Sequence, residues 1–172
     1  MSSPIDPLEL ALLSLASHGV DAIVVGMTAI NFYAKDPSEA YQTLDIDFLL
    51  RPDAKTLKVA LTSLRDAGFS FETGGEPFID VENDTALTNV VAYGSTLRCV
   101  FEGELMADLM LSIKGFSYEE ISADAVTFSV RGVNIRVGAL EKLIESKRQS
   151  GRPKDIAFLA RYDAAAQERR KK

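Results

Sequence analysis

Two aspartates stand inside an otherwise apolar segment, residues 43–50 (TLDIDFLL), and this segment constrains the fold more than any other. Its alternation of polar and apolar residues as far as Asp47 predicts a β-strand. Because residues i and i+2 of a strand point to the same face, Asp45 and Asp47 project side by side, while Leu44, Ile46 and Phe48 point to the opposite face. The chain must therefore build a sheet in which one face of this strand is apolar and the other carries two neighbouring carboxylates.

Periodicity and turn residues predict the elements around this strand. The helix Pro7–Ser17 has an apolar stripe and Asp6 as its N-cap, and Asp53 caps a second helix that stops at Gly68. The other expected helices are 28–34, 139–149 and 153–166, and the other expected strands are 21–25, 97–102, 105–113, 126–130 and 133–137. Residues 69–96 contain turn residues but no periodicity that predicts an element. Alternating helices and strands followed by hairpins indicate an α/β or α+β fold, with a mixed sheet flanked by helices and with helices at the C-terminal end.

Composition excludes several classes of protein. The 172 residues include 25 acidic and 19 basic residues, for a net charge of −6, and the four residues Arg169–Lys172 are all basic. An acidic chain does not coat duplex nucleic acid, because that binding depends on Lys and Arg contacts to phosphates. Cys99 is the only cysteine and His18 the only histidine, so a disulfide or a Cys-based zinc site within the chain is excluded. The length predicts a single domain over residues 1–166 and a flexible basic tail over 167–172.

Neither a targeting signal nor a membrane span is indicated. The first ten residues, MSSPIDPLEL, lack the basic segment and apolar core of a secretory signal. No apolar run approaches the roughly 18 residues that suggest a membrane span. The expectation is a soluble cytoplasmic protein without a membrane partner.

The carboxylates suggest a metal site. Like charges so close repel each other unless a cation lies between them, and Mg²⁺ prefers carboxylate and phosphate oxygens. Asp108 is an isolated charge in the apolar run LMADLMLSI, which is costly unless the carboxylate is paired or binds a metal. The alternatives are an edge strand that leaves Asp45 and Asp47 solvated, and an Asp108 that pairs with a nearby Arg or Lys.

A glycine turn precedes the two aspartates. In VVGMTAINFY, Gly26 ends a strand and opens a helix, and Thr28 offers a hydroxyl donor. Such a turn lets an anion approach the N–H groups at a helix N-terminus. A simple strand-to-helix turn is the alternative.

The spacing of Gly-x-Thr-Ala (26–29) and Thr-x-Asp-x-Asp (43–47) resembles the nucleotidyltransferase superfamily with the polymerase-beta-type fold, and in particular its minimal bacterial AbiEii-like group. The resemblance covers about residues 20–160, apart from 69–96. It implies that Gly26 and Thr28 contact the phosphates of an NTP, that Asp45, Asp47 and Asp108 bind Mg²⁺ or Mn²⁺, and that Lys147 neutralises triphosphate charge. In the closing segment, Arg152, Lys154 and Asp155 are expected to form ion pairs and a helix start.

The sequence departs from this family's pattern at three places, one of which is a long link between Gly26 and Asp45 with residues 35–40 as an apparent extra loop. Met27 stands where the family usually has Gly or Ser, and Tyr41-Gln42 stands where many members have Arg. The resemblance implies transfer of an NMP from an NTP to an unknown hydroxyl acceptor, such as an RNA end or a protein, in a toxin–antitoxin or phage-defence system. Because of Met27, the alternative is a catalytically impaired module that binds a nucleotide or a protein partner. A third interpretation is a glycosyltransferase whose Asp-x-Asp binds a metal and a sugar nucleotide.

Overall fold

A computed structural model describes residues 5–43 and 45–172 of the chain. Leu44, predicted to point away from the two aspartates, lies outside the described residues, as do the first four residues of the N-terminal segment. None of the described helices combines the length and the apolar character required to cross a bilayer.

The described strands form one mixed sheet. In chain order they are β1 (Ile23–Val25), β2 (Ile46–Leu49), β3 (Ser70–Thr73), β4 (Glu76–Phe78), β5 (Leu97–Phe101), β6 (Glu104–Met110), β7 (Val126–Val130) and β8 (Val133–Val137). Their spatial order is β4-β3-β5-β6-β2-β1-β8-β7. Two pairs are parallel, β2 with β6 and β1 with β8, and the others are antiparallel. The predicted mixed sheet is thereby confirmed, with β2 in its middle.

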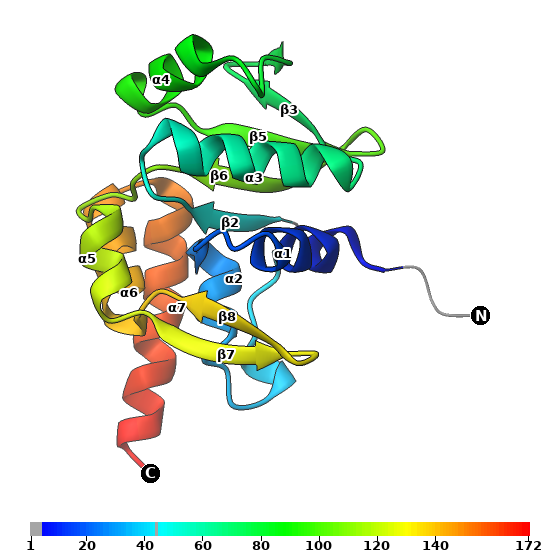
Figure 1. The fold of residues 1–172 in the computed structure, drawn as a ribbon. Coiled ribbons are helices and arrows are strands. Elements are labelled where there is room, and N and C mark those ends of the chain that lie inside the picture. Colours follow the sequence, from blue (N-terminus) through cyan, green and yellow to red (C-terminus); the bar gives the residue numbers. More distant parts are fainter. Residues whose placement is uncertain (1–4, 44) are drawn as a thin grey trace.

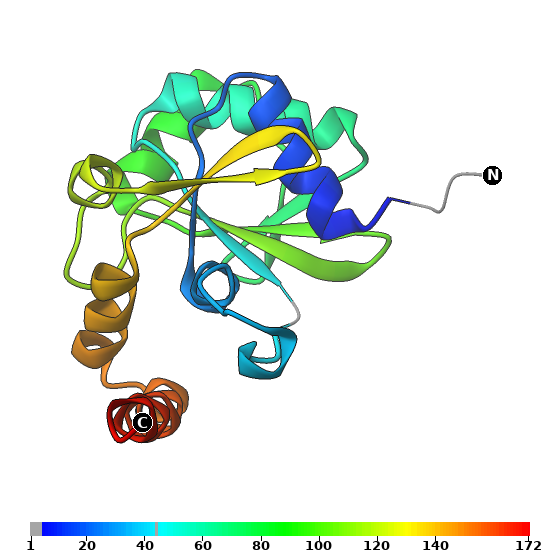
Figure 2. The same ribbon diagram turned by 90° about the horizontal axis from the view of Figure 1, so that it is seen from below.

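Helices cover both faces of this sheet. They are α1 (Pro7–Ser17), α2 (Gly26–Asn31), α3 (Ala54–Asp66), α4 (Asp84–Tyr93), α5 (Tyr118–Ala123), α6 (Leu140–Ser150) and α7 (Pro153–Arg170), with a short 3₁₀ turn at Pro37–Glu39. α1, α3 and α4 lie on one face, and α2, α6 and α7 lie on the other (Figures 1 and 2). The flanked mixed sheet is the α/β class that the sequence predicts.

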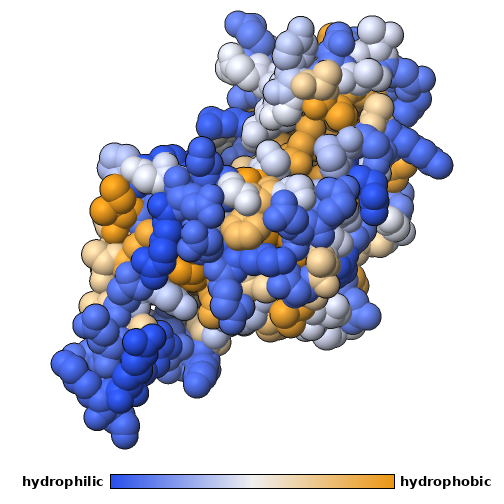
Figure 3. Space-filling model, turned by 90° about the vertical axis from the view of Figure 1, so that its left-hand side faces the viewer, coloured by the Kyte–Doolittle hydropathy of each residue, from blue (hydrophilic) through white to orange (hydrophobic). Residues whose placement is uncertain are grey.

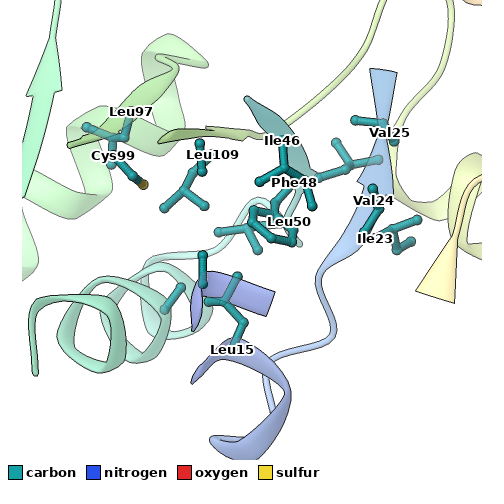
Figure 4. Close-up of a cluster of buried hydrophobic side chains, with 14 of the residues drawn as sticks. Leu15, Ile23, Val24, Val25, Ile46, Phe48, Leu50, Leu97, Cys99 and Leu109 are labelled. Carbon is teal, nitrogen blue, oxygen red and sulfur yellow. The ribbon is translucent and has the colours of Figure 1, made fainter. Parts of the chain in front are cut away.

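A large part of the hydrophobic core lies between the sheet and the helices α1 and α3. Phe48 of β2, Leu109 of β6 and Leu97 of β5 are each only 1% exposed. Figure 4 shows Phe48 and Leu109 on the side of the strands that faces Leu15 of α1. Fully burying such a side chain contributes about 1.5–3 kcal/mol, so this face stabilises the strands that carry the aspartates.

Local signals place several elements where the sequence predicts them. Asp6 and Asp53 each accept a hydrogen bond from a backbone N–H in the first turn of their helices, which confirms both N-caps. The hairpin of β7 and β8 has its predicted bounds, with Arg131 and Gly132 at positive φ in the turn.

Other elements differ from the prediction. Residues 69–96, which showed no clear pattern, contain β3, β4 and α4, and α5 was not predicted. The last helix continues through Arg170 instead of ending near Ala166, so most of the expected tail is helical. Its end protrudes from the body as a largely hydrophilic lobe in Figure 3. The boundaries of a single domain stay a prediction.

Candidate active site

Strand pairing brings the three aspartates together. In the parallel pair of β2 and β6, Asp47 lies directly beside Asp108. Asp45 precedes Asp47 by two residues, so both side chains project to the same side. One carboxylate oxygen from each of Asp45, Asp47 and Asp108 lies within 4.8 Å of the others. Three oxygens at this spacing can bind one divalent cation or share two.

The cluster carries negative charge that the neighbouring cations offset only in part. Burial, followed by the charges of Asp45 and Asp108, raises the pKa of Asp47 to about 6, although Lys147 and Lys154 oppose the shift. Burial and the charge of Asp45 also raise the pKa of Asp108, against Arg98 and Lys154. A divalent cation would remove this repulsion, so the donor set fits the oxygen-seeking metals that the sequence suggests.

Gly26 lies against one of these carboxylates. Its φ is +73°, and a Cβ at this position would lie 2.3 Å from Oδ2 of Asp47. A side chain here would therefore collide with the Asp47 carboxylate and strain the backbone. The close approach of Asp47 thus explains why residue 26 is a glycine. The predicted contact of Gly26 with a phosphate stays a prediction.

Thr28 points at the backbone of the acidic cluster. Its hydroxyl donates a hydrogen bond to the carbonyl oxygen of Asp45 at 2.9 Å. Thr43 donates to the same carbonyl at 3.1 Å. The hydroxyl that the sequence assigned to a phosphate is therefore engaged with the chain itself, and its phosphate role also stays a prediction.

Lys147 lies at the junction of α6 and α7. Its Nζ is 3.2 Å from Oδ1 of Asp155, whose side chain is only 2% exposed. Ser150 and Arg152 also donate hydrogen bonds to that carboxylate. Burial alone would raise the pKa of Asp155, yet the hydrogen bond from Ser150 and the charge of Lys147 lower it below its ordinary value. The ion pairs expected for Arg152 and Asp155 are present, and Lys147 joins them.

The three aspartates open into a cleft of about 1040 Å³. Lys147 and Arg152 line it from α6 and the start of α7, together with Lys154. Lys114 also lines the cleft. Lys154 and Lys114 have no ion-pair partner among the described residues. A cleft with carboxylates at one place and ammonium groups nearby suits an anion that arrives with a metal.

Arg98 is a site residue that the sequence reasoning missed. It pairs across β5 and β6 with Asp108, and its Nε lies 3.8 Å from Oδ1 of that aspartate. The sequence held a signal for it, because Arg98 alternates with Leu97 and Cys99, which are buried. This contact agrees with the alternative that Asp108 lies beside a cation, while the same carboxylate also belongs to the acidic cluster.

Met27, the departure from the family pattern, also lines the cleft. Its side chain is partly buried and packs against the hydrophobic core. The residue is therefore shared between the cleft wall and the interior of the protein.

No known protein-family model matches the chain, and no curated protein matches its sequence. Among solved structures, similarity is found to one described as a "putative nucleotidyltransferase from H. pylori", with a TM-score of 0.41 and 13% sequence identity. The similar region covers 82% of this chain and 54% of that chain, so this chain spans about half of that protein's length.

Proposed function

We propose that the chain is a metal-dependent nucleotidyltransferase that moves an NMP from an NTP to a hydroxyl acceptor. The convergence of Asp45, Asp47 and Asp108 at one end of a cation-lined cleft carries this proposal. Divalent cations bound there, Mg²⁺ or Mn²⁺, would supply Lewis acidity toward phosphate oxygens and toward the acceptor hydroxyl. In the reaction, the hydroxyl oxygen forms a bond to the α-phosphorus, pyrophosphate leaves with the electrons of the broken P–O bond, and the hydroxyl loses its proton.

The chain's own residues would divide the work. Asp45 and Asp47 hold metal on the side of β2, and Asp108 completes the set from β6. Asp108 also offers an oxygen that can take the acceptor proton if the acceptor comes within hydrogen-bond reach. Lys154 and Lys114 supply positive charge for the triphosphate, and Lys147 does so once it leaves Asp155.

The decisive test is labelling with α-phosphate-labelled NTPs. The purified chain is incubated with each of the four NTPs, Mg²⁺ or Mn²⁺, and total bacterial RNA or protein as a mixture of acceptors. Asp45→Ala should lose at least about 10³-fold of the labelling, because it removes a metal ligand that acts in the transition state. Asp66→Ala is the matched control and should label normally, because this exposed carboxylate on α3 pairs with Arg65 alone among the described residues. Equal labelling by wild type and Asp45→Ala would reject the assignment.

A second candidate is a nucleotide-binding module without turnover. Three observations favour it: Met27 lines the cleft, the Thr28 hydroxyl is engaged by Asp45, and Lys147 is paired with Asp155. Calorimetry with MgATP and MgGTP distinguishes the two candidates. Binding without any labelled product supports the module, and product formation with any acceptor excludes it.

A biological role in defence extends the proposal. The motif spacing favours the AbiEii-like group. Resemblance to that group implies a role in a toxin–antitoxin or phage-defence system and a protein partner. Expression of the chain in a bacterial host should arrest growth, and Asp45→Ala should relieve the arrest. Arrest by both forms would separate toxicity from the metal site.

A further inference from the structure

Side chains of α2 hold the backbone that leads into the first metal-site aspartate. The amide nitrogen of Asn31 donates to the carbonyl of Tyr41 at 2.8 Å, and the amide oxygen of Asn31 accepts from the N–H of Tyr41 at 2.7 Å. Four residues later, the hydroxyl of Thr28 donates to the carbonyl of Asp45 at 2.9 Å. The backbone is thus tied to one helix at both of these residues.

The two α2 residues lie on the same side of their helix. Thr28 and Asn31 are three positions apart, a spacing that places side chains next to each other on a helix. Their hydrogen bonds are partly buried, which reduces competition from water. Asn31 uses both its donor and its acceptor on one residue, so it restrains the orientation of that backbone as well as its position.

The ring of Tyr41 is held from another direction. It meets Phe158 edge-on with ring centroids 4.7 Å apart, and the guanidinium carbon of Arg161 lies 5.4 Å from its centroid. Both partners belong to α7. Tyr41 is therefore held between α2 and α7.

We propose that Thr28 and Asn31 form a clamp, here the α2 clamp, that positions Asp45 for metal binding. They are positioning residues, because they touch the backbone of the ligand segment and reach the metal only through it. The metal-binding part of this inference rests on the proposed function, whereas the restraint on the backbone does not. Removing a group that orients a metal ligand typically costs about 10–100-fold in metal affinity.

The first test measures Mn²⁺ affinity by the electron paramagnetic resonance signal of free Mn²⁺. Thr28→Val keeps the shape of the side chain but removes the hydroxyl. Asn31→Ala removes both hydrogen bonds that the side-chain amide makes with Tyr41. Each should weaken Mn²⁺ binding by about 10-fold or more. Thr28→Ser retains the hydroxyl and should bind Mn²⁺ with nearly wild-type affinity.

Tyr33→Phe is the matched control. The hydroxyl of Tyr33, just beyond α2, donates to the carbonyl of Gly138 at 2.7 Å, so this variant also loses one hydrogen bond from a side chain to the backbone. It should lower the melting temperature and leave Mn²⁺ affinity unchanged. If Thr28→Val and Asn31→Ala behave like Tyr33→Phe, the contacts only stabilise the fold and the proposal is wrong.

Hydrogen exchange of the metal-free protein tests the backbone restraint by the α2 clamp independently of metal binding. The Tyr41 amide should exchange faster in Asn31→Ala, and slowly in both wild type and Tyr33→Phe. Unchanged exchange in Asn31→Ala overturns the clamp, whatever the metal does. A wild-type protein that binds no Mn²⁺ while Asn31→Ala exchanges faster contradicts the metal site and supports the backbone restraint.

Discussion

The two faces of β2 and β6 differ sharply although one backbone pairing creates both. On one face, Ile46, Phe48 and Leu109 are each 1% exposed and face the core. On the other, Asp47 lies beside Asp108 with a pKa raised to about 6, chiefly by burial and by its acidic neighbours. Neighbouring residues of one strand therefore have opposite energetic roles, since burial of Phe48 stabilises the fold and burial of the Asp47 charge destabilises it. Substitutions on the two faces should change the stability of the metal-free protein in opposite directions.

The largest expected effect tests the apolar face. Phe48→Ala should lower the free energy of unfolding by about 3–5 kcal/mol, because it removes a fully buried ring and leaves a cavity. Urea unfolding at pH 7.5 measures the change. Val59→Ala, at a 38% exposed site on α3, is the control and should change stability by less than about 1 kcal/mol. A small loss for Phe48→Ala would mean that this face does not anchor the strand.

The next effect tests whether a cation relieves the acidic face. Mn²⁺ at about 100 times its dissociation constant should stabilise the wild type by about 2.7 kcal/mol, because only the folded chain assembles the three carboxylates. Thermal unfolding with and without EDTA measures this. Asp108→Asn should lose most of the stabilisation, and an equal response to Mn²⁺ in that variant would place the ion elsewhere.

A comparable change should follow from removing one charge. Folding raises the pKa of Asp47, so the native state holds its proton more tightly than the unfolded state and stability falls as pH rises from about 4 to about 6. Asp47→Asn removes this penalty. In EDTA at pH 7.5 it should raise stability by on the order of 2 kcal/mol, or about 4–8 °C in melting temperature.

The pH dependence provides the control for that variant. The gain of Asp47→Asn should shrink at pH 4.5, where most wild-type molecules already carry the proton. A gain that stays equal at both pH values would show that charge repulsion at Asp47 is not its cause.

The smallest expected change in stability concerns the contact between Gly26 and Asp47. Gly26→Ala should cost about 1–2 kcal/mol for the positive φ and should also displace the Asp47 carboxylate, thereby weakening Mn²⁺ binding. Gly19→Ala is the matched control, because Gly19 has a similar φ of +70° and no atom within 4 Å of its Cβ position. Equal Mn²⁺ affinity in both variants would show that the contact between Gly26 and Asp47 does not contribute to metal binding.

Sequence patterns predicted the acidic face well, because its signals are local or alternate with period 2. The pattern of residues 43–50 predicted a strand with both aspartates on one side, and Asp108 stood out as a charge in an apolar run. The observed strand β2 is shorter, Ile46–Leu49, and Asp45 lies just before it. Strand order is different in kind. That β6 pairs in parallel with β2, and that Asp108 therefore lies beside Asp47, depends on long-range packing that no local pattern encodes.

The missed elements carried weaker signals. In α4 only Leu87 and Val90 are buried, so its apolar stripe is too sparse to stand out, although Asn83 and Gly94 cap its two ends. The helix α5 has a capping box formed by Ser117 and Glu120, but it contains only six residues. Short elements of this kind form because tertiary packing supports them, which propensity alone does not reveal.

The parallel pairing of β2 with β6 also bears on how the site comes into being during synthesis. Asp45 and Asp47 leave the ribosome long before Asp108, and β1 gains its parallel partner only when Ile23 meets Arg136 of β8. Pairings between distant segments are slow to form, because the loop between them must close first. A nascent chain thus holds only two of the three clustered carboxylates until β6 is complete, so the acidic cluster itself forms late, with the closing of the sheet.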